Sequence, residues 1–190
     1  MDDRSVIIVS GLPRSGTSMM MRMLEAGGIP LLIDNLRQAD KDNPKGYYEF
    51  EKVKQIEQDT SWLPDAQGKA VKMVSALLKH LPPDYRYKIV FMRREMAEIL
   101  ASQRQMLVRR GEPTDLVSDE KMADLFERHL KQVIDWIDAQ PNVEVLYVSF
   151  NDVVKQPSEP VAQVNRFLGG AMDEAAMNAA VDPQLYRQRR

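Results

Sequence analysis

One stretch near the beginning of the chain constrains its fold more than any other. Residues 5–9 (SVIIV) form a continuous, largely β-branched apolar run, which is typical of a strand covered on both faces in a parallel sheet. The run ends at Ser10-Gly11, where the chain must turn. From Thr17 onward, methionines and a leucine recur at helical spacing until Gly27-Gly28 supplies a stop signal. The sequence therefore predicts a strand, a glycine-bounded loop and a helix in direct succession.

Strand patterns and helical patterns alternate along the rest of the chain. The strand patterns cover residues 70–74, 88–92 and 143–148, with a weaker candidate at 31–33. The helical patterns cover residues 94–108 and 122–137. This alternation predicts an α/β fold with a mostly parallel sheet flanked by helices. At 190 residues, the chain (1–190) is expected to form one domain.

The composition excludes several kinds of chemistry. The chain has no cysteine, which excludes disulfides and thiolate chemistry, and its two histidines, His80 and His129, cannot build a histidine-rich metal cage. The net charge of −2 gives no bulk electrostatic reason to bind nucleic acid or an acidic membrane. No apolar run approaches the ~18 residues of a spanning helix, and Val6–Val9 is too short for the core of a signal peptide. We therefore expect a cytoplasmic protein in which any anion site is a local cluster.

The loop between the first strand and the first helix has the pattern of an anion site. Residues 11–18 (GLPRSGTS) would wrap backbone N–H groups around a phosphate-like anion, and the following helix would add its positive dipole end. The octet almost fits the nucleotide-triphosphate P-loop, but Thr17 stands where that motif has its lysine. Because this lysine neutralises charge on the β- and γ-phosphates, its absence disfavours a kinase with an altered loop, which stays an alternative.

Two motifs carry a resemblance to the sulfotransferase family. Residues 12–18 (LPRSGTS) resemble the family's 5′-phosphosulfate loop, commonly P-[KR]-S-G-T-[ST], and residues 87–102 are similar to its 3′-phosphate element, a strand followed by an arginine and a serine eight residues later. Weaker similarities occur at residues 43–49 (NPKGYYE) and 145–169. The resemblance implies donor-binding roles for these residues: Pro13, Arg14, Ser15, Gly16, Thr17, Ser18, Arg94 and Ser102.

The resemblance also implies an activity. A sulfotransferase with a P-loop-type α/β fold would take 3′-phosphoadenosine-5′-phosphosulfate (PAPS) as donor and pass its sulfuryl group to a hydroxyl or amine of a small-molecule or glycan acceptor. Arg14 would balance the charge that builds on the leaving phosphate oxygen, and no metal is expected. Loops within residues 34–62 and 103–121 are expected to form the acceptor pocket. A donor-binding module without catalysis is a further alternative.

The general base is the part of the site that the resemblance does not supply. Many members place a histidine directly after a Lys-x at a strand end, whereas residues 72–74 here read Lys-Met-Val. Glu49 is the first candidate base, because a carboxylate can accept a proton at neutral pH, although it would also suit the start of a helix. His80 is the second candidate. We interpret His129 as structural, and Arg187, Arg189 and Arg190 as a solvated tail rather than a phosphate clamp.

Overall fold

A four-stranded parallel sheet forms the centre of the protein. The computed structural model describes residues 5–34, 36, 46–114 and 116–182. The strands are β1 (Val6–Gly11), β2 (Ala70–Lys72), β3 (Tyr87–Arg93) and β4 (Val143–Ser149), in the spatial order β2-β1-β3-β4. All three pairings are parallel, with Ile8 opposite Val71 and Ile89, and Val90 opposite Leu146. The predicted α/β fold with a parallel sheet is confirmed.

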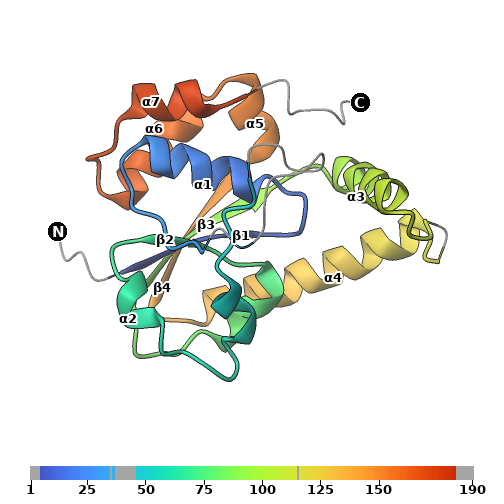
Figure 1. The fold of residues 1–190 in the computed structure, drawn as a ribbon, viewed down its shortest axis with the longest axis horizontal. Coiled ribbons are helices and arrows are strands. Elements are labelled where there is room, and N and C mark those ends of the chain that lie inside the picture. Colours follow the sequence, from blue (N-terminus) through green and yellow to red (C-terminus); the bar gives the residue numbers. More distant parts are fainter. Residues whose placement is uncertain (1–4, 35, 37–45, 115, 183–190) are drawn as a thin grey trace.

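Helices cover both faces of this sheet (Figure 1). One face carries the α-helices α1 (Thr17–Ala26), α5 (Phe150–Lys155), α6 (Ser158–Leu168) and α7 (Glu174–Ala180). The opposite face carries η1 (Glu51–Gln55), α2 (Leu63–Ala66), η2 (Ser75–His80) and α4 (Asp119–Asp138), of which η1 and η2 are 3₁₀ helices. The sheet is therefore the middle of three layers, as a parallel sheet buried on both faces requires.

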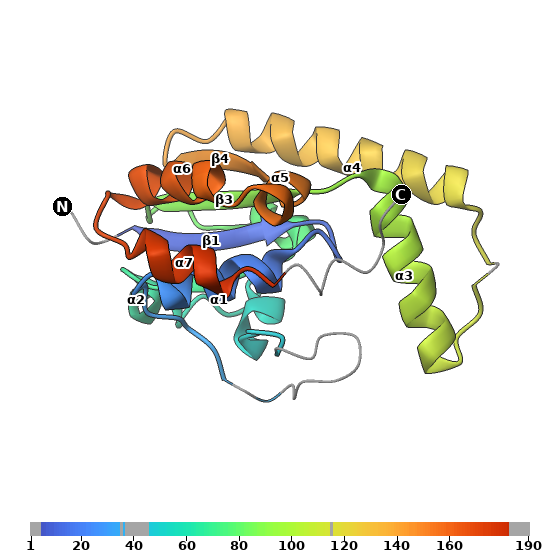
Figure 2. The same cartoon turned by 90° about the horizontal axis from the view of Figure 1, so that it is seen from above.

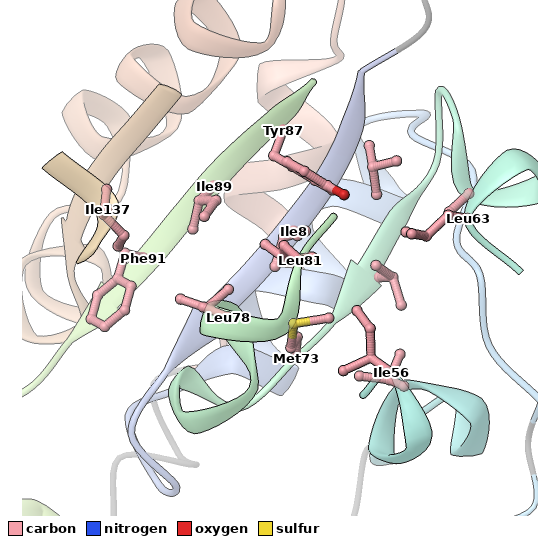
Figure 3. Close-up of a cluster of buried hydrophobic side chains, with 14 of the residues drawn as sticks. Ile8, Ile56, Leu63, Met73, Leu78, Leu81, Tyr87, Ile89, Phe91 and Ile137 are labelled. Carbon is pink, nitrogen blue, oxygen red and sulfur yellow. The ribbon is translucent and has the colours of Figure 1, made fainter. Parts of the chain in front are cut away.

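Side chains that alternate along the strands build a separate core on each face. Ile8, Ile89 and Phe91 point to the η1, η2 and α4 side, where they pack with Leu78 and Ile137 (Figure 3). The other face is rich in methionine: Met20, Met21 and Met23 of α1 are fully buried against Val9, Val90 and α5–α7. The methionines of α1 thus fill the core, as their helical spacing predicts.

The helix α3 (Met96–Arg110) and the first part of the helix α4 extend beyond the carboxyl edge of the sheet, and the two helices run in clearly different directions (Figures 1 and 2). The pattern at 94–108 lies within two residues of α3, and the pattern at 122–137 lies inside α4. Ser118 caps α4 by accepting a hydrogen bond from the backbone N–H of Lys121. None of the described helices is long and apolar enough to cross a membrane.

Two predicted strands differ from the structure. The strand expected at 70–74 ends at Lys72. Val74 still has an extended backbone, but it is the N-cap of η2, which the chain enters at Ser75. The weaker candidate at 31–33 is wrong as a strand. Leu31 forms only a single parallel bridge with Ala70, and Pro30, just before it, has no N–H with which to extend a ladder.

Candidate functional site

The loop between β1 and α1 lies at the carboxyl edge of the sheet, where ligands of parallel α/β folds bind. Two glycines allow its tight path. A Cβ on Gly11 would lie 2.6 Å from the carbonyl oxygen of Met92, and a Cβ on Gly16 would lie 2.4 Å from Cδ2 of Phe150. Gly16 is also the N-cap of α1 and has a φ of 99°. The loop is therefore pressed between β3 and the start of α5, at the positive end of α1.

A buried hydroxyl inside this loop is consistent with an anion site. Ser15 is 1% exposed, and its Oγ has no hydrogen-bond partner within the described residues. An unpaired buried hydroxyl is costly, so such a group in a native protein needs an explanation. The hydroxyl lies beside Gly11, where a Cβ would come within 2.5 Å of it. An oxyanion bound in the loop would give this hydroxyl an acceptor.

The structure brings the two sulfotransferase-like motifs into direct contact. The Nε of Arg14 donates a hydrogen bond to the Oγ of Ser102 at 2.9 Å, and Ser102 lies in the second turn of α3. The Nη1 of Arg94 donates to the backbone carbonyl of Arg14 at 3.0 Å. Arg14 itself has a φ of 71°, in the left-handed region that few non-glycine residues adopt. The loop and the end of β3 therefore form one polar site around the Arg14 peptide.

Arg94 is largely enclosed by its other contacts. Its Nε pairs with Glu98 Oε2 at 2.9 Å, and the side chains of Arg94 and Glu98 are only 7% and 6% exposed. The guanidinium carbon lies 4.3 Å from the ring centroid of Phe150, the residue that also packs against Gly16. A guanidinium carries five N–H donors in a planar fork, a geometry that suits carboxylate and phosphate groups.

Lys72 is the functional candidate that the sequence reasoning missed. It is the last residue of β2, and its Nζ donates to the Oγ of Ser18 at 3.3 Å and to the backbone carbonyl of Tyr47. The same Nζ lies 3.4 Å from Oε1 of Glu49, whose other oxygen lies 3.8 Å from Lys54 Nζ. The sequence signal for Lys72 was a lysine at the carboxyl end of a predicted strand, because residues at that edge of a parallel sheet lie near the loop that follows β1. Lys72 thus adds a third cation to the site, beside Arg14 and Arg94, and brings Glu49 next to the first turn of α1.

The two histidines lie on the other side of the sheet from α1. His80 is the last residue of η2, and within the described residues no hydrogen bond or ion pair joins it to Arg14, Lys72 or Glu49. His129 of α4 shares a hydrogen bond of 2.8 Å with the hydroxyl of the buried Ser75. Burial, with a smaller contribution from the nearby Lys79 ammonium, holds the pKa of His129 below its usual value.

Two other predicted features cannot be placed. Residues 43–45 of the NPKGYYE element and the terminal Arg187, Arg189 and Arg190 lie outside the described residues. Across the parts of the chain that the structure describes, no three acidic or histidine side chains are grouped as a metal ion would need.

Comparisons with known proteins agree with this arrangement. A family model described as "Sulfotransferase domain" matches residues 4–185, so the chain belongs to the sulfotransferase family and is a sulfuryl-transferring enzyme. No individual curated protein sequence matches it significantly.

Solved structures with the same fold are also sulfotransferase domains. The sulfotransferase domain from the Synechococcus PCC 7002 olefin synthase has a TM-score of 0.57 at 16% identity, over 100% of this chain and 89% of its own. The sulfotransferase domain from the curacin biosynthetic pathway has a TM-score of 0.53 at 13% identity, over 94% of this chain and 78% of its own. The fold is therefore that of sulfotransferase domains.

Proposed function

We propose that the enzyme transfers the sulfuryl group of PAPS to a hydroxyl or amine of a small-molecule or glycan acceptor. The observation that carries this proposal is that Arg14 of the anion loop is hydrogen-bonded to both Ser102 and Arg94. These two bonds join the anion loop to a second cationic site. The donor carries anionic groups at two separate points, the 5′-phosphosulfate and the 3′-phosphate. A site for a nucleotide with only one anionic chain would not need the second cluster.

The donor's phosphosulfate end fits the loop. The Ser15 hydroxyl lacks an acceptor within the described residues, and the N-terminal end of α1 favours negative charge. Thr17 and Ser18 add hydroxyls in the first turn of α1, and Pro13 precedes the left-handed Arg14. Arg94 and Ser102 are proposed to hold the 3′-phosphate, with Arg94 as the charged donor and Ser102 as the hydroxyl.

Two cations are available where charge develops during the reaction. As the acceptor oxygen or nitrogen bonds to sulfur, the bond between sulfur and the bridging phosphate oxygen breaks, and negative charge grows on that phosphate oxygen. Arg14 is proposed to stabilise this charge, since its guanidinium is already oriented by Ser102. Lys72 is proposed to assist from the opposite side of the loop, where it contacts Ser18.

Glu49 is proposed to take the acceptor's proton. Its contact with Lys72 brings the carboxylate to the side of the loop on which Ser18 lies, whereas His80 has no hydrogen bond to any of these groups within the described residues. The Glu49 side chain is 19% exposed, and its Oε1 is the oxygen that faces Lys72. General-base catalysis requires the carboxylate to lie within hydrogen-bond reach of the acceptor's proton, and we propose that Glu49 does so once the acceptor is bound.

The test is a direct transfer assay. Purified protein is incubated with PAPS and a panel of alcohols, phenols, amines and sugars, and 3′-phosphoadenosine-5′-phosphate (PAP) and the sulfated product are quantified by mass spectrometry. We expect acceptor-dependent PAP release that Lys72→Met reduces strongly, because this variant keeps the length of the side chain but removes its charge. ATP with magnesium serves as the competing donor. Phosphorylated product from ATP, with no transfer from PAPS, would contradict the proposal and support the kinase alternative.

A further inference from the structure

A buried polar cluster made of Arg94, Glu98 and Asn151 lies behind the donor loop. Glu98 accepts from Arg94 Nε at 2.9 Å through one carboxylate oxygen and from Asn151 Nδ2 at 3.1 Å through the other. The Oδ1 of Asn151 accepts from the backbone N–H of Glu95, the N-cap of α3, at 3.4 Å. The cluster therefore joins the end of β3, the start of α3 and the start of α5.

Because the cluster is buried, its polar groups must find their hydrogen-bond partners within the protein. Glu98 is 5% and Asn151 is 7% exposed, so neither group has much access to water. A buried ion pair contributes little net stability compared with well-packed apolar side chains, but removal of one partner leaves an uncompensated charge. The cluster is therefore better explained by the geometry that it imposes than by the stability that it adds.

That geometry reaches the donor loop through the side chain of Arg94. Arg94 is held by Glu98 on its Nε edge and by the ring of Phe150 on its face, and from there its Nη1 donates to the carbonyl of Arg14. The carbonyl belongs to a residue with a φ of 71°, so this bond holds a strained peptide in place. The Arg94 guanidinium and the Arg14 peptide therefore both depend on this arrangement.

We propose that Glu98 and Asn151 are positioning residues for the donor site: without touching the donor, they orient Arg94, which in turn holds the Arg14 peptide. This inference rests on the proposed function, because it presumes that Arg14 and Arg94 bind PAPS. Asn151 aligns the carboxylate of Glu98 and links it to the N-cap of α3. Glu98 supplies the charge that keeps the Arg94 guanidinium in one orientation.

The test measures donor binding and turnover separately from folding. Glu98→Gln removes the charge with little change in size, and we expect it to weaken PAP binding by tenfold or more in isothermal titration calorimetry. We also expect a larger rise in the KM for PAPS than fall in kcat. Asp135→Asn is the matched control, because Asp135 forms an exposed i,i+4 pair with Lys131 on α4, far along the chain from the loop. The control variant should bind PAP as the wild type does.

A second variant keeps the inference testable if Glu98→Gln does not fold. Asn151→Ala leaves the Arg94–Glu98 pair in place and removes only the aligning amide, so we expect a smaller loss of PAP affinity, about threefold to tenfold. If both variants fold, their effects should be less than additive in the double variant, because both act through Arg94. Variants that melt at lower temperature but bind PAP with wild-type affinity when folded would overturn the inference. Absence of PAP binding by the wild type would instead overturn the proposed function.

Discussion

Gly16→Ala is the perturbation whose cost follows most directly from the structure. Two effects add at this position. The φ of 99° disfavours any L side chain by about 1–2 kcal/mol, and a new Cβ would meet Cδ2 of Phe150 at 2.4 Å, a clash of the kind that costs about 1–3 kcal/mol when the core must shift. We therefore expect Gly16→Ala to lower the free energy of unfolding by about 2–5 kcal/mol.

A matched glycine separates the two effects. Gly28 has a φ of 94°, and a Cβ added there would meet nothing within 4 Å. Gly28→Ala should therefore lose only the conformational part, about 1–2 kcal/mol. In the double variant Gly16→Ala/Phe150→Leu, the smaller side chain should relieve part of the clash, so the measured loss should be smaller than the sum of the two single losses.

Urea denaturation followed by tryptophan fluorescence measures these differences, since Trp62 is 2% exposed in the core. Midpoints should shift while the slopes of the transitions stay the same, which indicates a change in stability rather than in the denatured state. Equal losses for Gly16→Ala and Gly28→Ala, or strict additivity with Phe150→Leu, would refute the packing of α5 against the donor loop.

Three further predictions concern the site and the pH dependence of stability. Arg14→Ala should lower kcat by about 100-fold or more while PAP affinity, measured by calorimetry, falls less; a loss of affinity alone would make Arg14 a binding residue only. Glu49→Gln should lower kcat by about 100-fold or more with an unchanged circular dichroism spectrum, whereas near-native turnover would pass the role of base to His80 or to the acceptor itself. Because the pKa of His129 lies below its usual value of about 6.5, its protonation favours the unfolded chain, so the free energy of unfolding should be highest above that pH and fall as the pH drops toward 5. His129→Gln should flatten this dependence in denaturation curves collected from pH 5 to 8.

The elements that could be predicted are those set by local patterns. The β-branched run that contains Val6–Val9, the glycines that bound the loop and the helical spacing of Met19, Met20 and Met23 are local signals, and the structure has β1, the loop and α1 where they indicate. The spacing between Arg94 and Ser102 was informative in the same way, because both residues belong to one strand–helix unit, Arg94 just after β3 and Ser102 in the second turn of α3. Their direct connection to Arg14 is a tertiary contact that follows from the pairing of β1 with β3.

The features that sequence reasoning missed depend on contacts between distant segments. Lys72 ends a strand of only three residues. Its position relative to Ser18 and Glu49 is set by the pairing of β2 with β1 and by the contact of Ser18 with the Tyr47 carbonyl. The cluster of Glu98 and Asn151 joins residues 53 positions apart in the chain. A buried glutamate in the first turn of a helix reads in sequence as an ordinary dipole-compensating residue, so its burial could not be predicted.

The measurement that tests the central claim most directly is a thermal-shift comparison of PAP, AMP and ATP with magnesium on the wild-type enzyme. At 100 times its dissociation constant, a ligand stabilises the folded state by about 2.7 kcal/mol, which is a readily measured shift in melting temperature. We expect PAP to stabilise the protein at much lower concentration than AMP, because only PAP carries the 3′-phosphate for Arg94 and Ser102. ATP with magnesium should stabilise it less than PAP. Equal shifts for PAP and AMP, or the largest shift with ATP and magnesium, would contradict it.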